Sequence, residues 1–330
     1  MAPAQSVQRR IKMKIRKYIP LLLLATLSAL SIFLYTDYPL RHQAESKVAE
    51  EIEKPRIIAT LFPQYDFTKQ IVKERASVEL LLPPGAESHT YEPSPGDILK
   101  INKADIFIYT GRNMEGWADK ILSANQNKKL ITVDVSEGIK LLLHEGEDDS
   151  DEHHHVLDPH IWTDPNNAMI MTENILSALC EAYPSEADYF RTNAEKFKSE
   201  LKELDREFRQ AVAAGKRNKV VFGGRNAFGY FLKQYGLESI FAIDICSAEA
   251  DPGVKRITDM IKEIREENIS VIFYGYLVVP KIAKTISAET GAKLLPFNSC
   301  HNFSDQDLKK GVTYVSAMRE NLKNLKEGLK

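Results

Sequence analysis

The stretch SEADYFRTNAEKFKSELKELDREFRQAVAA, residues 185–214, places its apolar side chains at steps of three and four and contains no strand pattern. Ser185 fits the start of a helix and Gly215 fits its end. A helix of this length would measure roughly 45 Å. Because that exceeds one face of a small lobe, the stretch predicts a rigid spine that joins two lobes with a cleft between them.

Short apolar runs alternate with helical patterns on both sides of this stretch. Candidate strands cover residues 56–61, 78–82, 105–109 and 129–133 before it, and 219–222, 240–243, 271–274 and 293–296 after it. Candidate helices between the strands include residues 94–103, 252–267 and 280–290. This alternation favours parallel sheets covered by helices. We therefore predict an α/β fold, with an N-terminal α/β lobe over 56–184, a linking helix over 185–214 and a C-terminal α/β lobe over 215–330.

The N-terminus combines a basic run with an apolar segment. Six Lys and Arg residues and no acid lie within the first seventeen positions, and residues 19–35 are almost wholly apolar. This order is typical of a secretory signal or a membrane anchor, with a buried core helix as the alternative. We predict a signal or anchoring transmembrane helix over 1–36 and a polar tether over 37–55. The body would then lie on the outer face of the cytoplasmic membrane or in the periplasm.

Charge excludes one class of partner. The formal net charge is −2, and the residues after the basic run carry −8. This balance gives no electrostatic reason to bind nucleic acid. The chain also lacks the G-x-x-x-x-G-K-[ST] phosphate loop, so any ATPase activity would belong to a separate chain.

Two short strings each place one histidine in a loop bounded by prolines. They are PGAESHTYEP, which contains His89, and DPHIWTDP, which contains His160. In parallel α/β sheets such loops line the ligand crevice. Neutral imidazole is a good zinc ligand, and a carboxylate such as Glu92 or Asp158 could fix its tautomer. The two strings indicate a candidate metal site, although either histidine alone is more often structural.

Five strings carry a resemblance to a known family: GAESHTYEPSPGDI, ADIFIYTGRNMEGWADK, DPHIWTDPNNA, AFGYFLKQYGL and GVTYVSAMRENLKNLK. They resemble the solute-binding proteins of ABC-type zinc and manganese importers, from about residue 56 to the C-terminus. The resemblance implies two α/β lobes joined by one long helix, with the metal in the inter-lobe cleft. It also implies a monomer that delivers zinc, or alternatively manganese, to a membrane permease served by a separate ATPase.

An acidic loop, HEGEDDSDEHHH at 144–155, lies where zinc-type members of this family often carry a His-rich loop. It has no apolar residue to bury, which predicts a mobile surface loop. A metal-collecting loop and a merely solvated loop are both compatible with its composition.

The resemblance implies four protein ligands, and His89 and His160 match the first two. The third position is Arg225, whose guanidinium cannot bind a cation. Gly275 and Tyr276 stand where zinc members place a glutamate, and Asn298 stands where manganese members place an aspartate. The chain is most similar to a divergent zinc-type branch with arginine at the third position and a Cys-His-Asn string near the end.

Cys300 and His301 in that string could complete the ligand set as a thiolate and an imidazole. A disulfide between Cys246 and Cys300 is the rival explanation, because such bonds persist outside the membrane. It would leave His301 as the main candidate. The predicted zinc ligands are therefore His89, His160, His301 and Cys300.

Arg225 has two interpretations. It could pair with Glu249 or Asp251 and close the cleft, or it could place an uncompensated positive charge beside the metal and weaken binding. The second interpretation favours a degenerate member with weak or no metal binding that acts as an adhesin or accessory partner.

An enzyme, specifically a zinc hydrolase, is the other alternative. Catalytic zinc needs three protein ligands, an open water position and a nearby base. The chain contains no H-E-x-x-H string, and we therefore predict a binding protein rather than an enzyme.

Overall fold

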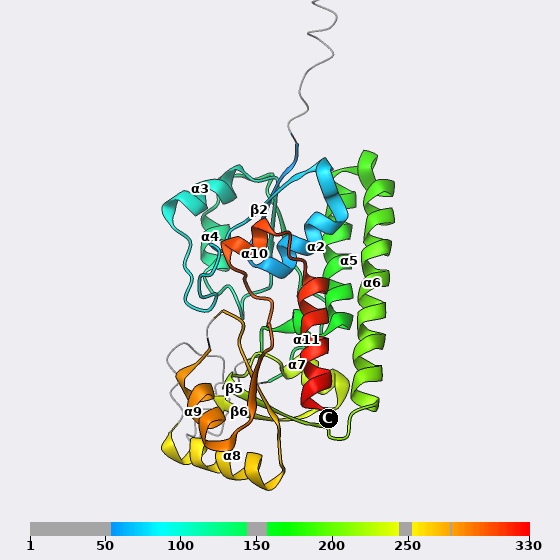
Figure 1. Ribbon diagram of the computed structural model, residues 1–330. Helices are drawn as coiled ribbons and strands as arrows, with labels where there is room; N and C mark the ends of the chain where they lie inside the picture. The colour runs from blue at the N-terminus through cyan, green and yellow to red at the C-terminus, as the bar shows by residue number, and fades with distance from the viewer. Residues whose placement is uncertain (1–53, 144–156, 244–252, 278) are drawn as a thin grey trace, which may run out of the picture. The chain divides into compact units, whose positions relative to one another are not determined.

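The computed structural model describes residues 54–143, 157–243, 253–277 and 279–330 (Figure 1). The described residues belong to one compact unit, Lys54–Lys330. Several predicted features lie outside the described residues: the anchor, most of the tether, the acidic loop, Cys246, Glu249 and Asp251. Within the described ranges, no helix combines the length and the apolar character needed to cross a membrane.

The first lobe is built on a four-stranded parallel sheet in the order β2-β1-β3-β4. Its strands are β1 (Arg56–Ala59), β2 (Ser77–Leu80), β3 (Ile106–Tyr109) and β4 (Ile131–Asp134). Its helices are α2 (Phe62–Val72), η1 (Lys73–Arg75), α3 (Pro95–Lys103) and α4 (Ala118–Ala124). The central strands β1 and β3 are almost entirely buried, as expected for a parallel sheet covered on both faces.

The second lobe repeats this topology with the strand order β6-β5-β7-β8, again all parallel. Its strands are β5 (Lys219–Arg225), β6 (Glu238–Ile243), β7 (Val271–Tyr274) and β8 (Lys293–Pro296). Its helices are α7 (Gly229–Tyr235), α8 (Val254–Glu266) and α9 (Lys281–Thr290). The predicted α/β class with two parallel-sheet lobes is confirmed.

The long helix is also confirmed: α6 covers Ala187–Ala213. It packs along α5 (Pro165–Ala182), α2 and α11 (Tyr314–Gly328), as Figure 1 shows. Three short elements complete the described chain, namely η2 (Ile161–Thr163), η3 (Pro184–Glu186) and α10 (Asp305–Lys309). The buried face of α6 recurs every three or four residues, with Phe190, Phe197, Leu204 and Phe208 among its members.

One hydrophobic cluster runs through both lobes and the spine. It contains Phe67 and Trp162 from the first half of the chain, and Phe231, Phe273 and Phe297 from the second. Phe297 contacts four other aromatic rings, those of Phe222, Phe228, Phe231 and Phe273. Because Phe297 directly precedes residues 298–303, this packing fixes the start of the loop that carries His301.

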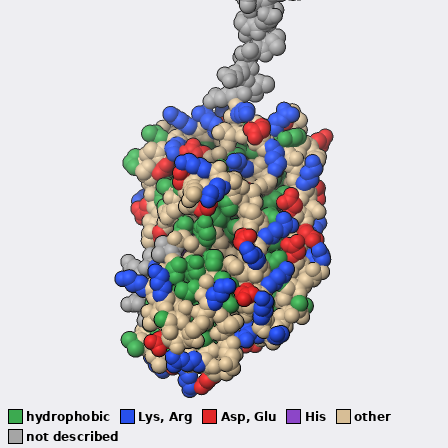
Figure 2. All heavy atoms as spheres, viewed as in Figure 1, with side chains coloured by type: hydrophobic (Ala, Val, Ile, Leu, Met, Phe, Trp, Pro, Cys, Tyr) green, Lys and Arg blue, Asp and Glu red, His purple; other side chains and the backbone are tan. Residues whose placement is uncertain are grey.

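The surface mixes both charge signs. Figure 2 shows Lys and Arg side chains interspersed with Asp and Glu over the visible face, and apolar side chains gathered near its middle. Exposed large apolar residues include Tyr276 and Leu277, which follow β7.

Candidate metal centre

His89 lies in the loop between β2 and α3, and both ends of that loop are fixed. At its start, Asn302 donates from Nδ2 to the carbonyls of Pro83 (2.7 Å) and Ala86 (3.1 Å). At its end, Ser94 and Asp97 form a reciprocal capping box at the start of α3. The loop that carries His89 is therefore held between the 298–303 segment and a well-capped helix.

His160 immediately precedes η2, and its side chain is buried. Asp158 accepts from the His160 backbone N–H (2.9 Å), and its Oδ1 lies 2.5 Å from His160 Nδ1. The carboxylate thus holds the proton on Nδ1 and leaves the Nε2 lone pair available, an arrangement typical of metal-binding histidines. Among the two carboxylates that the sequence suggested for this role, Asp158 occupies it.

A glycine makes room for this carboxylate. A Cβ atom at Gly229, the first residue of α7, would lie only 2.6 Å from Asp158 Oδ2. The neighbouring Tyr230 donates from its hydroxyl to the Asp158 carbonyl (2.8 Å). The start of α7 therefore packs directly against the residue that orients His160.

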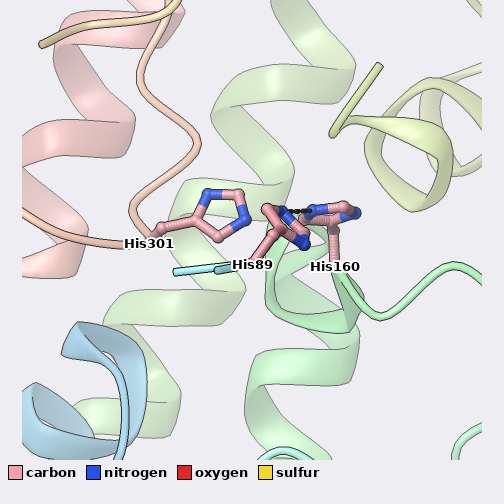
Figure 3. A group of neighbouring side chains, drawn as sticks. All are labelled: His89, His160 and His301. Atoms are coloured by element: carbon pink, nitrogen blue, oxygen red, sulfur yellow. Dashed lines mark hydrogen bonds between the residues drawn. The ribbon is translucent and has the colours of Figure 1, made fainter. Parts of the chain in front are cut away.

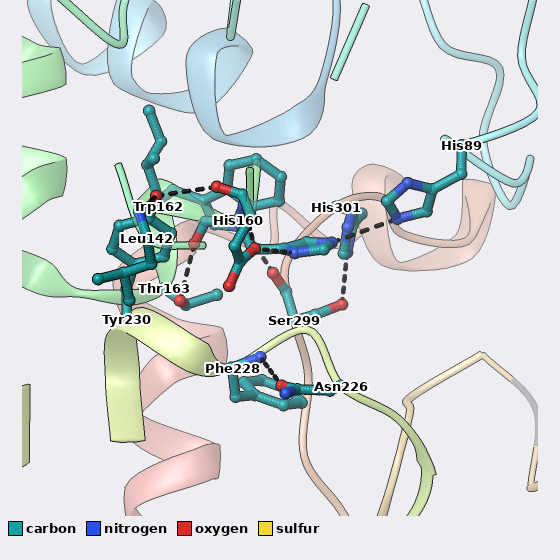
Figure 4. Close-up of polar contacts among 12 residues, drawn as sticks. His89, Leu142, His160, Trp162, Thr163, Asn226, Phe228, Tyr230, Ser299 and His301 are labelled. Carbon is teal, nitrogen blue, oxygen red and sulfur yellow. Dashed lines mark hydrogen bonds and ion pairs between the residues drawn. The ribbon is translucent and has the colours of Figure 1, made fainter. Parts of the chain in front are cut away.

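His301 lies in the loop after β8. Its Nδ1 is 2.6 Å from Ser299 Oγ, whereas its buried Nε2 has no hydrogen-bond partner among the described residues (Figure 4). Burial, followed by the neighbouring His160 and His89, lowers the pKa of His301 well below its usual value. His301 is therefore a neutral imidazole, and leaving its buried Nε2 unpaired costs stability. A metal ion is a partner that would satisfy this atom.

The three imidazoles converge (Figure 3). One ring nitrogen from each of His89, His160 and His301 lies within 4.8 Å of the others. His89 Nε2 and His160 Nε2 are 3.2 Å apart. Two nitrogens bound tetrahedrally to zinc at 2.0–2.1 Å would be about 3.3 Å apart, so this spacing already suits a shared ion. Because Asp158 keeps the His160 proton on Nδ1, His89 Nε2 donates this hydrogen bond in the metal-free protein, and zinc would replace that proton.

Cys300, the fourth predicted ligand, does not join this group among the described residues. It is a buried free cysteine, and its Sγ lies 3.8 Å from the carbonyl of Asn298. Burial, with a smaller contribution from Asp66, raises its pKa far above the usual range, so the thiol stays protonated. Its backbone has a positive φ of 60°, and Asn298 Oδ1 accepts its N–H (2.7 Å). In this structure Cys300 shapes the turn that precedes His301.

Arg225 ends β5 and faces the loop of the other lobe. Its Nη1 lies 3.6 Å from Glu87 Oε2, and Glu87 Oε1 accepts from the His89 backbone N–H (3.2 Å). An ion pair across the cleft was one of the two interpretations of Arg225. Among the described residues Glu87 of the His89 loop is such a partner, while the suggested partners Glu249 and Asp251 lie outside the described residues. Sequence reasoning missed Glu87 because Arg225 is 138 positions later in the chain, and only the folded sheets bring the two together.

Two parallel-sheet lobes joined by a long helix, with three imidazoles converging where their loops meet, are the architecture that the resemblance to solute-binding proteins implied. The chain belongs to the family described as zinc-uptake complex component A, periplasmic, whose family model matches residues 57–328. The resemblance to solute-binding proteins of zinc and manganese importers is confirmed at this level.

Named relatives agree with this family. The zinc-binding lipoprotein AdcA of Streptococcus pneumoniae is 34% identical over 313 residues, which cover 93% of this chain and 60% of that protein. The chain thus spans less than two thirds of the length of this relative. The high-affinity zinc uptake system protein ZnuA of Bacillus subtilis is 31% identical over 285 residues, 84% of this chain and 88% of that protein. The crystal structure of the Zn(II)-bound ZnuA-like domain of S. pneumoniae AdcA superposes with a TM-score of 0.72 at 32% identity, covering 84% of this chain and 99% of that domain.

Proposed function

We propose that this chain binds one Zn²⁺ through His89, His160 and His301 and is the extracytoplasmic binding component of a zinc importer. The observation that carries the proposal is the convergence of three imidazole nitrogens, one of them buried without a partner. This arrangement supports binding over the degenerate alternative, in which the loops would have no reason to leave a buried nitrogen unpaired.

Zinc suits the donor set better than manganese does. The group of three contains imidazoles and, within the described part of the chain, no carboxylate. Imidazole favours zinc, whereas manganese sites depend on carboxylate and other oxygen ligands. The relatives named for zinc binding and zinc uptake support the same choice.

The transport role follows from the family. A protein of this kind hands its ion to a membrane permease, with ATP hydrolysed by a separate chain. We propose that residues 1–36 export or anchor the protein, that it works as a monomer outside the cytoplasmic membrane, and that it is a binding protein rather than an enzyme. The periplasmic family description and the lipoprotein name of one relative support the location.

Calorimetric zinc titration tests the site. Wild-type protein should take up one zinc, and His89→Ala, His160→Ala and His301→Ala should each weaken binding at least about tenfold, or about 1.4 kcal/mol. Cys300→Ser is the matched control within the same loop and should retain the zinc affinity if the protein stays folded. Wild-type protein that binds no zinc would refute the proposal, and unchanged affinity in all three histidine variants would place the ion elsewhere.

A further inference from the structure

The first lobe contains a cavity of its own between α3 and α4 (Figure 1). Its volume is about 670 Å³, and it is lined by the end of the His89 loop, by both helices and by the turn that precedes α4. Among the described residues, His89 is the one that lines both this cavity and the space beside His301. Pockets for small organic molecules have volumes of roughly 300–1,000 Å³, so this cavity can hold such a ligand.

Part of the cavity wall is aromatic and aliphatic. The rings of Tyr91 and Trp117 meet edge to face, with centroids 6.4 Å apart. Ile98, Met114 and Ile121 line the cavity beside them. An apolar wall of this kind suits a hydrocarbon or aromatic group of a ligand.

Two side chains of opposite charge also line the cavity. Glu92 lies at the end of the His89 loop, and Lys120 lies in α4. Both are exposed, and neither forms an ion pair or a side-chain hydrogen bond among the described residues. They are therefore available to a ligand that carries one charge of each sign, and such complementary charges would fix its orientation.

A buried amide marks the end that suits the negative group. Asn125 directly follows α4 and is only 7% exposed. Its Oδ1 accepts from the Asn127 backbone N–H (2.7 Å), whereas its Nδ2 has no hydrogen-bond partner among the described residues. Because an unpaired buried donor is costly, an acceptor in the cavity would stabilise this group. A carboxylate offers only acceptors, and it would be attracted to Lys120 as well.

We propose that this cavity binds a free amino acid with an apolar side chain. The carboxylate of the amino acid meets Lys120 and the Asn125 amide, its ammonium group meets Glu92, and its side chain lies against Trp117. A residue within a peptide carries neither of these two charges on its backbone, so the free amino acid fits better. The inference goes beyond the proposed zinc function and does not depend on a bound metal ion.

L-phenylalanine is the probe that tests this site, with metal-free, full-length protein in the presence of EDTA. The chain has two tryptophans, Trp117 in the cavity and Trp162 beside His301. L-phenylalanine should bind in calorimetry and give a saturable change in tryptophan fluorescence. The Trp117→Phe variant should lose that change and still bind. Wild-type protein that binds no L-phenylalanine overturns the proposal, and so does a fluorescence change that persists in Trp117→Phe, because it would place the ligand near Trp162.

Two analogues and two variants test the charges. L-phenylalaninamide lacks the carboxylate, and 3-phenylpropionate lacks the ammonium group. Wild-type protein should bind L-phenylalanine at least about threefold more tightly than either analogue, as expected for exposed ion pairs. Lys120→Gln should erase the preference over the amide, and Glu92→Gln should erase the preference over 3-phenylpropionate.

Lys129→Gln is the matched control, because Lys129 is exposed in the same lobe and does not line the cavity. It should keep both preferences, and thermal melting checks that every variant is folded. A preference that survives in the folded variant meant to erase it contradicts the proposal. Zinc titration of the same proteins is a separate measurement, so failure of the amino-acid site would leave the proposed zinc function standing.

Discussion

At the scale of single residues, the site depends on groups that do not touch the ion. Asp158 fixes the His160 tautomer through a 2.5 Å contact, and Ser299 lies 2.6 Å from the outer nitrogen of His301. Such supporting groups commonly contribute ten- to a hundredfold in metal affinity. Gly229 belongs with these supporting groups, because a side chain at Gly229 would collide with the Asp158 carboxylate.

Gly229→Ala tests this support. The new Cβ would lie 2.6 Å from Asp158 Oδ2, a separation that real side chains do not show, and the buried carboxylate has little room to move. We expect zinc affinity to fall about tenfold as His160 loses its orientation. Gly96→Ala is the control, because its nearest new contact is an ordinary 3.5 Å. Unchanged zinc affinity in folded Gly229→Ala protein, measured by calorimetry, would show that Asp158 does not orient the ligand.

The sequence predicted the histidines better than their surroundings. His89 and His160 were found because each lies in a short, distinctive string, and His301 because it adjoins a cysteine in a string that resembled the family. The contacts of Asp158 with Gly229 and of Glu87 with Arg225 join residues 71 and 138 positions apart, so no local pattern could reveal them. Cys300 was expected to offer its sulfur, but the backbone turn at φ 60° and its burial were not readable from residue type.

At the scale of elements, the apolar periodicity predicted which helices and strands exist more reliably than it predicted the residues at which they begin and end. The step of three and four placed a helix over 185–214, and α6 covers Ala187–Ala213. All eight candidate strands are present, with β6 beginning two residues earlier than expected, at Glu238. Its added residues are exposed, so they carried no apolar signal. The link from the 298–303 segment to the His89 loop, through Asn302, could not be predicted, since it depends on how the two sheets face each other.

The turn between β3 and α4 contains a buried carboxylate that should make stability depend on pH. Glu115 accepts from Thr60 Oγ1 (2.5 Å) and from the backbone of Thr110 and Gly111 (both 3.1 Å). Burial raises its pKa to about 7 despite these hydrogen bonds. Because the folded protein holds this proton more tightly than the unfolded chain does, the stabilisation is complete below about pH 4 and is lost as pH rises through 7.

Glu115→Gln should therefore flatten the fall in unfolding free energy between pH 5 and 8. Between these pH values the unfolding free energy of the wild type should fall by up to about 3 kcal/mol more than that of the variant, since one pKa unit corresponds to about 1.4 kcal/mol. Urea denaturation at several pH values measures it. Glu74→Gln, at an exposed residue, serves as the control and should reproduce the wild-type slope. Parallel curves for wild type and Glu115→Gln would rule out this residue as the source.

The acidic loop is predicted to be dispensable for folding. Leu143 and Leu157, on either side of residues 144–156, form an antiparallel bridge, so the described chain is already closed at its base. Replacing residues 145–155 by two glycines should change the unfolding free energy by no more than about 1 kcal/mol. Zinc affinity should be unchanged, while the rate of zinc capture could fall. Stopped-flow mixing measures the rate, and a larger loss of stability would mean that the loop packs against the body.

At the scale of the described body, the two lobes share one core. The main hydrophobic cluster includes Ile57, Ile106 and Ile108 from the first sheet. It also includes Phe222 and Phe273 from the second sheet. Helices α6 and α11 lie along this cluster and contact elements of both halves. Each lobe also has a smaller hydrophobic cluster of its own. Because the main cluster crosses both boundaries, we propose 184 and 214 as limits of lobes within one cooperative unit.

This shared core predicts one unfolding transition, which zinc should shift as a whole. Trp162 reports on the centre, because its ring lies 4.9 Å from that of His301 and its Nε1 donates to the Ser299 carbonyl (2.6 Å). Tryptophan fluorescence and far-UV circular dichroism should melt together. Zinc at a hundred times its dissociation constant should add about 2.7 kcal/mol, which raises the melting temperature by roughly 5 to 10 °C. The His301→Ala variant should melt in one step as well but lose most of the zinc shift. Two separate transitions, or a fluorescence midpoint that moves while the dichroism midpoint stays, would mean that the lobes unfold independently and that zinc holds only one of them.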